Sequence, residues 1–70
     1  MTGTVTLTLN GESRTLAAPL TVSGLLDSLG FDARKVAVER NEEIVPRSLY
    51  ATTILAQGDA LEIVHFIGGG

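Results

Sequence analysis

Strict alternation of polar and apolar residues near the amino terminus most constrains how this chain can fold. Between residues 4 and 9, three threonines alternate with Val5, Leu7 and Leu9. Successive side chains of a strand point to opposite faces, so this pattern predicts a strand with one buried and one wet side. Asn10-Gly11 follows at once. Both residue types tolerate positive φ, and we therefore expect a tight hairpin turn.

The returning strand, at residues 12–18, is less well defined. It alternates poorly, and a loop of two or of three residues would reverse which side chains face inward. The sequence leaves both registers open. Leu16 is the best candidate for a contact with the core.

An amphipathic helix is predicted after the hairpin. Thr21 is suited to be its N-cap. Apolar residues then recur at the spacing of one helix face: Val22, Leu25, Leu26 and Leu29. Gly30 can end the helix in the left-handed conformation, with Phe31 packing back on the last turn. Gly24, inside the helix, lowers helix stability by about 1 kcal/mol relative to alanine. The sequence offers no reason for a glycine there unless a neighbouring backbone passes close.

Three further strands are predicted in the second half of the chain. Residues 35–40 form the first, with Val36 and Val38 inward. Asn41-Glu42 then turns the chain into Ile44-Val45, which Pro46 ends because proline has no N–H for a ladder bond.

The last strand is predicted at residues 61–67, the most apolar stretch of the chain. Gly58-Asp59 turns the chain into it, and Leu61 and Ile63 are expected to face the helix. Residues 47–57 form a connection. Four of its side chains are expected to contact the core: Leu49, Tyr50, Ile54 and Leu55.

The order of these elements predicts an α+β fold. Every apolar face is buried with short connections when a single mixed sheet of four to five strands wraps around one main helix. This is the ubiquitin-like β-grasp arrangement, and the apolarity of the last strand fits a central place beside the first. We expect a β-grasp domain over residues 1–67 and a flexible glycine tail at residues 68–70.

Composition argues against several classes of function. The chain has no cysteine and one histidine, which excludes a disulfide framework and a Cys/His zinc site. Five Lys/Arg against eight Asp/Glu give a net charge of −3, the wrong sign for nucleic acid or anionic lipid. No signal peptide or membrane-length apolar run is visible. No catalytic constellation is visible either, so we expect a cytoplasmic protein that is not an enzyme.

The carboxyl end has specific chemistry. Gly68-Gly69-Gly70 form a thin, pliable thread that can enter a narrow channel in another protein. The terminal carboxylate is ionised at pH 7, since its reference pKa is about 3.3–3.7, and it is a poor electrophile until ATP converts it to a mixed anhydride with AMP. The plainer interpretation is a frayed end or a linker remnant.

Several motifs together resemble the ThiS family of sulfur carriers in thiamine biosynthesis. They are residues 36–47 (VAVERNEEIVPR), Tyr50, Gly58-Asp59 and the ending at residues 62–70 (EIVHFIGGG). The Leu9-Asn10-Gly11-Glu12 hairpin and the helix sequence agree with them. The resemblance covers essentially the whole chain.

The resemblance implies a two-stage cycle centred on Gly70. An E1-like adenylyltransferase (ThiF-type) would adenylate the Gly70 carboxylate with ATP and magnesium. A sulfur donor such as a cysteine desulfurase, or a rhodanese-type persulfide, would then give a thiocarboxylate. Thiazole synthase (ThiG-type) would accept this sulfur for the thiazole ring of thiamine. Gly69 and Gly70 match the diglycine end, Gly68 is an additional glycine, and the carrier itself binds no cofactor.

A partner-binding surface is expected next to the tail, at Val64, Phe66 and Ile67, with Val64 and Phe66 on the open face of the sheet. The alternative is that loop residues such as Tyr50 or Ile54 cover them. His65 is expected to be partly buried and structural. Pro46 and Tyr50 are expected to position the loop, and Arg47 to be a surface charge able to pair with an acidic partner residue.

Other functions remain open at the level of sequence. The small subunit of molybdopterin synthase shares the fold and the diglycine end, although residues 44–47 (IVPR) and His65-Phe66 favour the thiamine member. A ubiquitin-like modifier or tRNA-thiolation carrier is a further possibility. A plain interaction module is another, and it would tolerate changes at Gly70.

Overall fold

The computed structural model describes residues 3–66, and the elements over this range follow the predicted order. Two strands come first, then the helix, then three strands. Short 3₁₀ helices precede β3 and follow β4. The bounds are β1 Gly3–Leu9, β2 Glu12–Ala18, α1 Val22–Leu29, η1 Ala33–Lys35, β3 Val36–Arg40, β4 Glu43–Val45, η2 Arg47–Leu49 and β5 Ala60–His65.

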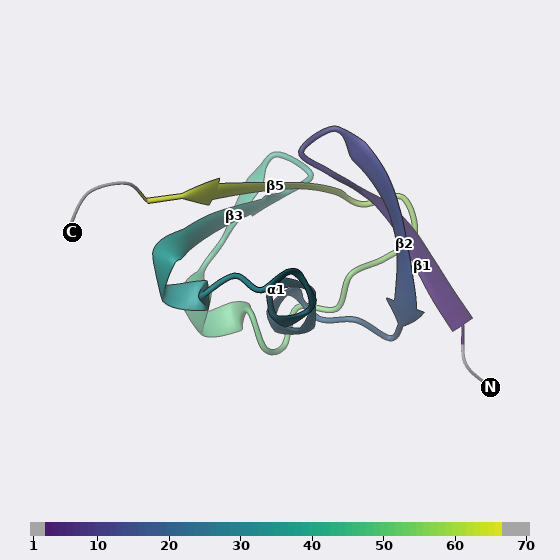
Figure 1. Cartoon of the computed structure of the whole chain (residues 1–70), viewed down its shortest axis with the longest axis horizontal. Helices are drawn as coiled ribbons and strands as arrows, with labels where there is room; N and C mark the ends of the chain where they lie inside the picture. Colours follow the sequence, from purple (N-terminus) through teal and green to yellow (C-terminus); the bar gives the residue numbers. More distant parts are fainter. Residues whose placement is uncertain (1–2, 67–70) are drawn as a thin grey trace.

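The strands form one mixed sheet in the order β2-β1-β5-β3-β4, with α1 lying across one face (Figure 1). β5 runs parallel to β1 and antiparallel to β3. The other two neighbouring pairs are antiparallel hairpins. The central position predicted for the last strand is therefore confirmed. Its bounds differ from the prediction, because the strand begins at Ala60 and ends at His65.

Two tight hairpin turns fix the registers of the sheet. Leu9 is paired with Glu12, so the first loop has two residues, Asn10 at φ 49° and Gly11 at φ 86°. This register places Leu16 opposite Val5, half-buried against the core as predicted. In the second hairpin Arg40 is paired with Glu43, and the two turn residues again have positive φ.

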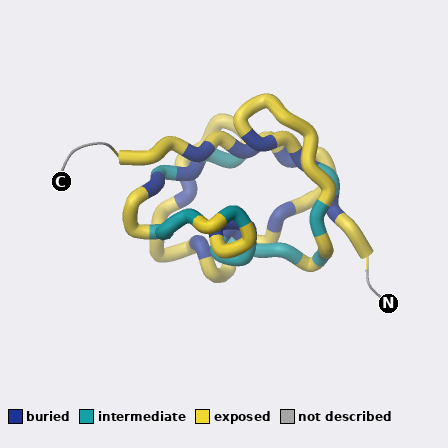
Figure 2. Tube along the Cα trace, in the orientation of Figure 1, coloured by how far each residue is buried: buried dark blue, intermediate teal, exposed yellow. Residues whose placement is uncertain are grey.

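The core lies between the sheet and α1, where the buried positions of both face each other (Figure 2). The predicted caps of the helix are confirmed. The Thr21 hydroxyl accepts a hydrogen bond from the Gly24 N–H at 3.0 Å. Gly30 adopts φ 77°, and the Phe31 N–H donates to the Leu26 carbonyl at 2.9 Å.

The structure explains the glycine inside α1. A Cβ at position 24 would lie 3.2 Å from Cδ1 of Leu20 and 3.4 Å from Oγ1 of Thr21. The close neighbours are therefore two side chains and not a passing backbone. Glycine leaves room for Leu20 to pack against the core beside the N-cap.

Two of the four core contacts predicted for the β4–β5 connection are wrong. Tyr50 and Leu55 are buried, but Leu49 and Ile54 are 47% and 61% exposed. Ile54 forms an isolated β-bridge with Thr21. In extended backbone, neighbouring side chains point to opposite sides. Because Leu55 points into the core, Ile54 points to solvent. Leu49 ends η2, where the following Tyr50 takes the inward position and donates its hydroxyl proton to the Val36 carbonyl.

Candidate functional site

The first requirement of the candidate site is a well-held β5, because this strand leads to the glycine end. β1 pairs with β5 only over Thr8 and Leu9. Beyond that point the Asn10 side chain continues the ladder: its Oδ1 accepts from the Ile63 N–H at 2.9 Å, and its Nδ2 donates to the Ile63 carbonyl at 3.3 Å. A turn residue thus replaces a strand residue as the partner of β5.

Asn41, in the second hairpin turn, binds the start of the same strand. Its backbone N–H donates to the Ala60 carbonyl at 2.8 Å, and its Oδ1 accepts from the Ala60 N–H at 2.9 Å. Asparagine suits both turns because its short polar side chain tolerates the left-handed conformation. The two hairpin turns therefore hold β5 from opposite sides.

Asp59, immediately before β5, is a buried carboxylate with three hydrogen-bond donors. Oδ2 accepts from Arg40 Nε and from the Ala56 N–H, each at 2.8 Å, and Oδ1 accepts from Asn41 Nδ2 at 3.0 Å. Burial alone would raise the pKa of Asp59, but the bonds from Ala56, Asn41 and Arg40 outweigh it and lower the pKa. The sequence predicted only a turn here.

The end of β5 presents apolar side chains to solvent. Leu61 and Ile63 are buried, as predicted, whereas Val64 and Phe66 are 60% and 57% exposed. The alternative in which loop residues cover them is wrong: Tyr50 is buried in the core and Ile54 is itself exposed. The backbone of Phe66 still donates to the Lys35 carbonyl at 2.9 Å, so the apolar pair is carried on an ordered backbone.

His65 is exposed, and its predicted partial burial is wrong. Its position in the strand directs it to the helix side, where its ring meets Phe31 edge to face with a centroid distance of 4.7 Å. Pro46 is the N-cap residue of η2, and its carbonyl accepts a hydrogen bond from the Leu49 N–H. Arg47 is exposed and donates to the Arg34 carbonyl at 3.2 Å.

The predicted tail residues Gly68, Gly69 and Gly70 and the predicted contact residue Ile67 lie outside the described residues. Their roles stay predictions, as does the boundary between domain and tail.

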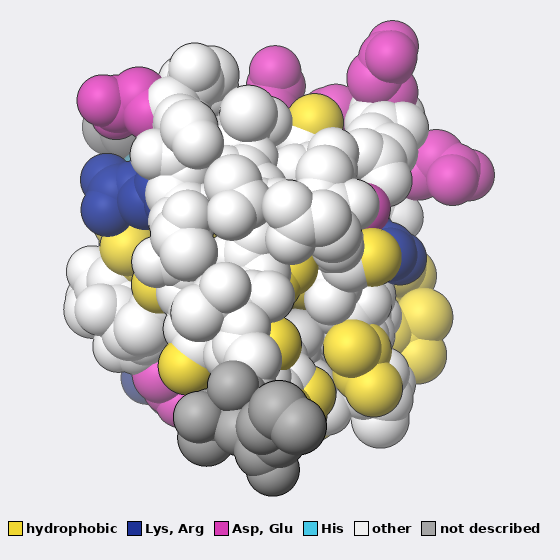
Figure 3. All heavy atoms as spheres, turned by 90° about the vertical axis from the view of Figure 1, so that its right-hand side faces the viewer, with side chains coloured by type: hydrophobic (Ala, Val, Ile, Leu, Met, Phe, Trp, Pro, Cys, Tyr) yellow, Lys and Arg dark blue, Asp and Glu magenta, His cyan; other side chains and the backbone are white. Residues whose placement is uncertain are grey.

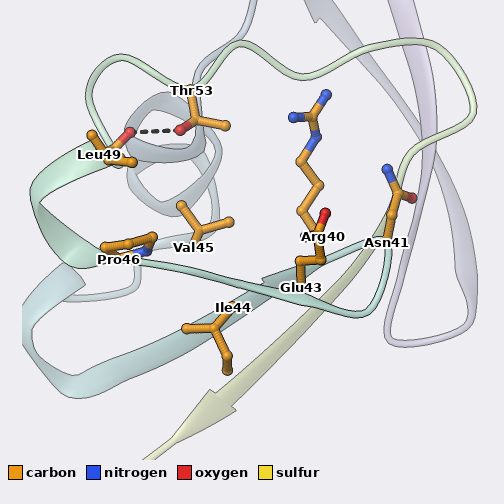
Figure 4. Close-up of a pocket in the computed structure, with 8 residues that line it drawn as sticks. All are labelled: Arg40, Asn41, Glu43, Ile44, Val45, Pro46, Leu49 and Thr53. Atoms are coloured by element: carbon orange, nitrogen blue, oxygen red, sulfur yellow. Dashed lines mark hydrogen bonds between the residues drawn. The ribbon is translucent and has the colours of Figure 1, made fainter.

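A pocket of 220 Å³ that the sequence did not predict lies beside β4 (Figure 4). Its wall is formed by the β3–β4 hairpin and by the segment from η2 to Thr53. Ile44 and Val45 leave β4 on opposite sides, so that Val45 is buried while Ile44 is 66% exposed. The lining residues are Arg40, Asn41, Glu43, Ile44, Val45, Pro46, Leu49 and Thr53.

On the end of the molecule that carries β1 and β2, most of the acidic side chains in view project along the upper edge, and the basic side chains in view lie lower (Figure 3). Within residues 3–66, no group of three or more acidic or histidine side chains is placed to hold a metal ion. None of the helices in this range has the length and apolarity needed to cross a membrane.

The sequence model of the ThiS family matches residues 7–70, which includes β5 and the glycine end. The chain belongs to the ThiS family. The sulfur carrier protein ThiS of Bacillus subtilis is 44% identical over 50 residues, which cover 71% of this chain and 76% of the relative.

A solved structure of the family confirms the fold. The crystal structure of the thiamine biosynthesis protein ThiS from Geobacter metallireducens matches this ThiS-family chain with a TM-score of 0.81 and 39% identity. The match covers 94% of this chain and 100% of that one. The ubiquitin-like β-grasp fold predicted from the element order is thus the fold of this protein.

Other relatives are much longer proteins. A thiazole synthase of Paramagnetospirillum magneticum is 61% identical over 64 residues, and one of Magnetococcus marinus is 52% identical over 62 residues. These matches cover 91% and 89% of this ThiS-family chain but only 20% and 19% of the relatives. The chain therefore spans about a fifth of the length of these thiazole synthases.

Proposed function

We propose that this chain is a sulfur carrier on which partner enzymes act, with the Gly70 carboxylate as the group that is modified. The observation that carries the proposal is the match of the ThiS family over residues 7–70, which includes the glycines. The structure adds support, because β5 is held from both sides and approaches the glycine end with exposed Val64 and Phe66.

The proposed chemistry starts from an unreactive carboxylate. An oxygen of the Gly70 carboxylate attacks the α-phosphorus of magnesium-bound ATP in an E1-like adenylyltransferase, and pyrophosphate leaves. A persulfide from a donor such as a cysteine desulfurase then attacks the acyl-adenylate and displaces AMP. The product is an acyl disulfide between Gly70 and the donor. A thiol then attacks the donor-side sulfur, forms a new disulfide with it, and releases the thiocarboxylate on Gly70. Gly68 and Gly69 have no side chains, so they can carry this group into a narrow active site.

We further propose thiazole synthase as the acceptor and the thiazole ring of thiamine as the destination of the sulfur. Two observations support this pathway. Related solved structures carry the name thiamine biosynthesis protein, and the two longer relatives are thiazole synthases that contain a matching segment. The cycle would take place in the cytoplasm, and Val64, Phe66 and Ile67 would contact the partner enzymes.

Intact-mass spectrometry tests the proposal directly. The purified chain ending in Gly70 is incubated with the activating enzyme of the same organism, magnesium, ATP and a persulfide donor. We expect the mass change that corresponds to one terminal oxygen replaced by sulfur. A variant with one residue added after Gly70 should show no change, whereas the same addition before Met1 should be modified normally. Absence of both adenylate and thiocarboxylate on the unaltered chain would overturn the proposal.

A further inference from the structure

We propose that the outer face of the sheet, opposite α1, binds a cationic and apolar surface of thiazole synthase. The outer face is defined here by Glu39, Ile44, Glu62, Val64 and Phe66. This inference rests on the proposed function and adds the chemistry by which the carrier recognises its acceptor.

Strand register brings the two acidic members of the outer face together. Val38, Val45 and Ile63 form one buried row across β4, β3 and β5. The adjacent row therefore points to the other side of the sheet. In that row Glu39 is paired with Glu62 across β3 and β5, and with Ile44 across β3 and β4.

This juxtaposition is unfavourable in the isolated chain. Like charges directly opposite each other on neighbouring strands destabilise a sheet. The ion pairs found over residues 3–66 are Asp32–Arg34 and Arg40–Asp59, and neither includes Glu39 or Glu62. Arg40, the residue next to Glu39, is held by Asp59 and cannot relieve the repulsion without giving up that bond. A cation supplied from outside would relieve it.

Exposed apolar side chains border the acidic pair. Ile44 and Val64 are 66% and 60% exposed, and Phe66 follows directly after β5. Apolar neighbours exclude water when a partner covers them, which strengthens the attraction between a buried cation and the carboxylates. Arginine fits best, because its planar guanidinium can bind carboxylates and lie against apolar surface at the same time.

The longer relatives favour thiazole synthase as the occupant. In them a segment 61% or 52% identical to this chain belongs to the same polypeptide as a thiazole synthase. Covalent linkage raises the effective concentration of one part for the other, so even a weak interface is occupied there. Electrostatic attraction between the two surfaces would strengthen such an interface. The outer face also adjoins the strand that leads to the glycine end.

A charge-neutral double variant tests the inference. Glu39→Gln with Glu62→Gln removes both carboxylates and keeps their size, and Glu12→Gln with Asp27→Asn removes two charges elsewhere as the matched control. Affinity for the thiazole synthase of the same organism is measured by isothermal titration calorimetry at low and high salt. We expect about tenfold weaker binding at low salt for the outer-face variant alone, with the difference shrinking at high salt.

Thermal unfolding separates a binding role from a structural one. Because the pair repels, its removal should leave the melting temperature unchanged or raise it. Binding equal to that of the control overturns the inference, and so does weaker binding accompanied by a lower melting temperature. The same titration is made with the activating enzyme. If the outer-face variant binds only that enzyme more weakly, thiazole synthase is rejected as the occupant. Whatever the binding result, normal thiocarboxylate formation on the unaltered chain leaves the proposed function standing. The absence of thiocarboxylate on the unaltered chain would refute that function, independently of the outer face.

Discussion

At the scale of single residues, the buried carboxylate of Asp59 is the most consequential side chain outside the apolar core. It accepts hydrogen bonds from Arg40, Asn41 and Ala56, and so joins the second hairpin to the start of β5. Asp59→Asn keeps the size of the side chain but removes its charge. The amide N–H₂ of the asparagine would face hydrogen-bond donors and could not accept from them. We expect the free energy of unfolding to fall by about 2 to 4 kcal/mol, measured by urea denaturation.

The exposed carboxylate of Asp32 provides the matched control for this substitution. Asp32 is bound to Arg34 at 3.1 Å on the surface, where solvent screens the pair. Asp32→Asn should therefore cost much less than Asp59→Asn. Equal losses for the two variants would contradict the assignment of Asp59 as an anchor of β5.

The lowered pKa of Asp59 also predicts how stability depends on pH. Burial would raise this pKa, but the three donors lower it below the unfolded reference of about 3.9. The resulting stabilisation is complete above that reference and is lost as pH falls through the folded pKa. Asp32, with its pKa lowered to about 2 by Arg34, acts in the same direction. We expect unfolding free energy to decline below about pH 4, and less steeply in Asp59→Asn. Identical pH profiles would refute this account.

At the scale of elements, β5 depends on a turn residue for part of its pairing. Asn10→Gly retains the positive φ that the turn needs but removes both bonds to Ile63. We expect a loss of about 1 kcal/mol in unfolding free energy and at least about tenfold faster hydrogen exchange at the Ile63 amide. Asn10→Asp keeps the acceptor for the Ile63 N–H, so its unfolding free energy and exchange rate should lie between those of the unaltered chain and Asn10→Gly. Unchanged exchange at Ile63 in Asn10→Gly would show that the side chain does not hold the strand.

Elements whose signals are local were predicted well from the sequence. Alternation at Val5, Leu7 and Leu9, the Asn10-Gly11 turn and the Thr21 and Gly30 caps depend on neighbours in the chain, and all were confirmed. The exposure of Leu49 and Ile54 was missed because it depends on which neighbour takes the inward position in tertiary structure.

The candidate site shows the same division between local and distant determinants. Strand parity placed Val64 and Phe66 on the open face, but their exposure also required that no distant loop cover them. The Asp59 network was missed because two of its three donors, Arg40 and Asn41, come from a hairpin far away in the chain. The exposed Ile44 beside the acidic pair follows from register across three strands, which no single segment encodes.

At the scale of the whole molecule, folding and sulfur chemistry should be separable. The buried apolar residues extend from Val5 to Ile63 within the described residues. Asn41 and Asn10 hold β5 through Ala60 and Ile63 respectively. We therefore expect deletion of residues 68–70 to change the free energy of unfolding by less than about 0.5 kcal/mol. The same deletion should abolish formation of the adenylate, because the carboxylate no longer reaches the activating enzyme's nucleotide.

Two measurements on one sample test this separation: urea denaturation for the fold and intact-mass spectrometry for the adenylate. Asn10→Gly supplies the opposite case, since it weakens β5 but leaves Gly70 in place, so it should lose stability and still be adenylated. A truncated chain that unfolds more readily would mean that the tail contributes to the core. A truncated chain that still accepts AMP would mean that Gly70 is not the reactive end. The proposed carrier mechanism predicts that neither outcome occurs, because in that mechanism the fold presents the carboxylate and the partner enzymes supply the chemistry.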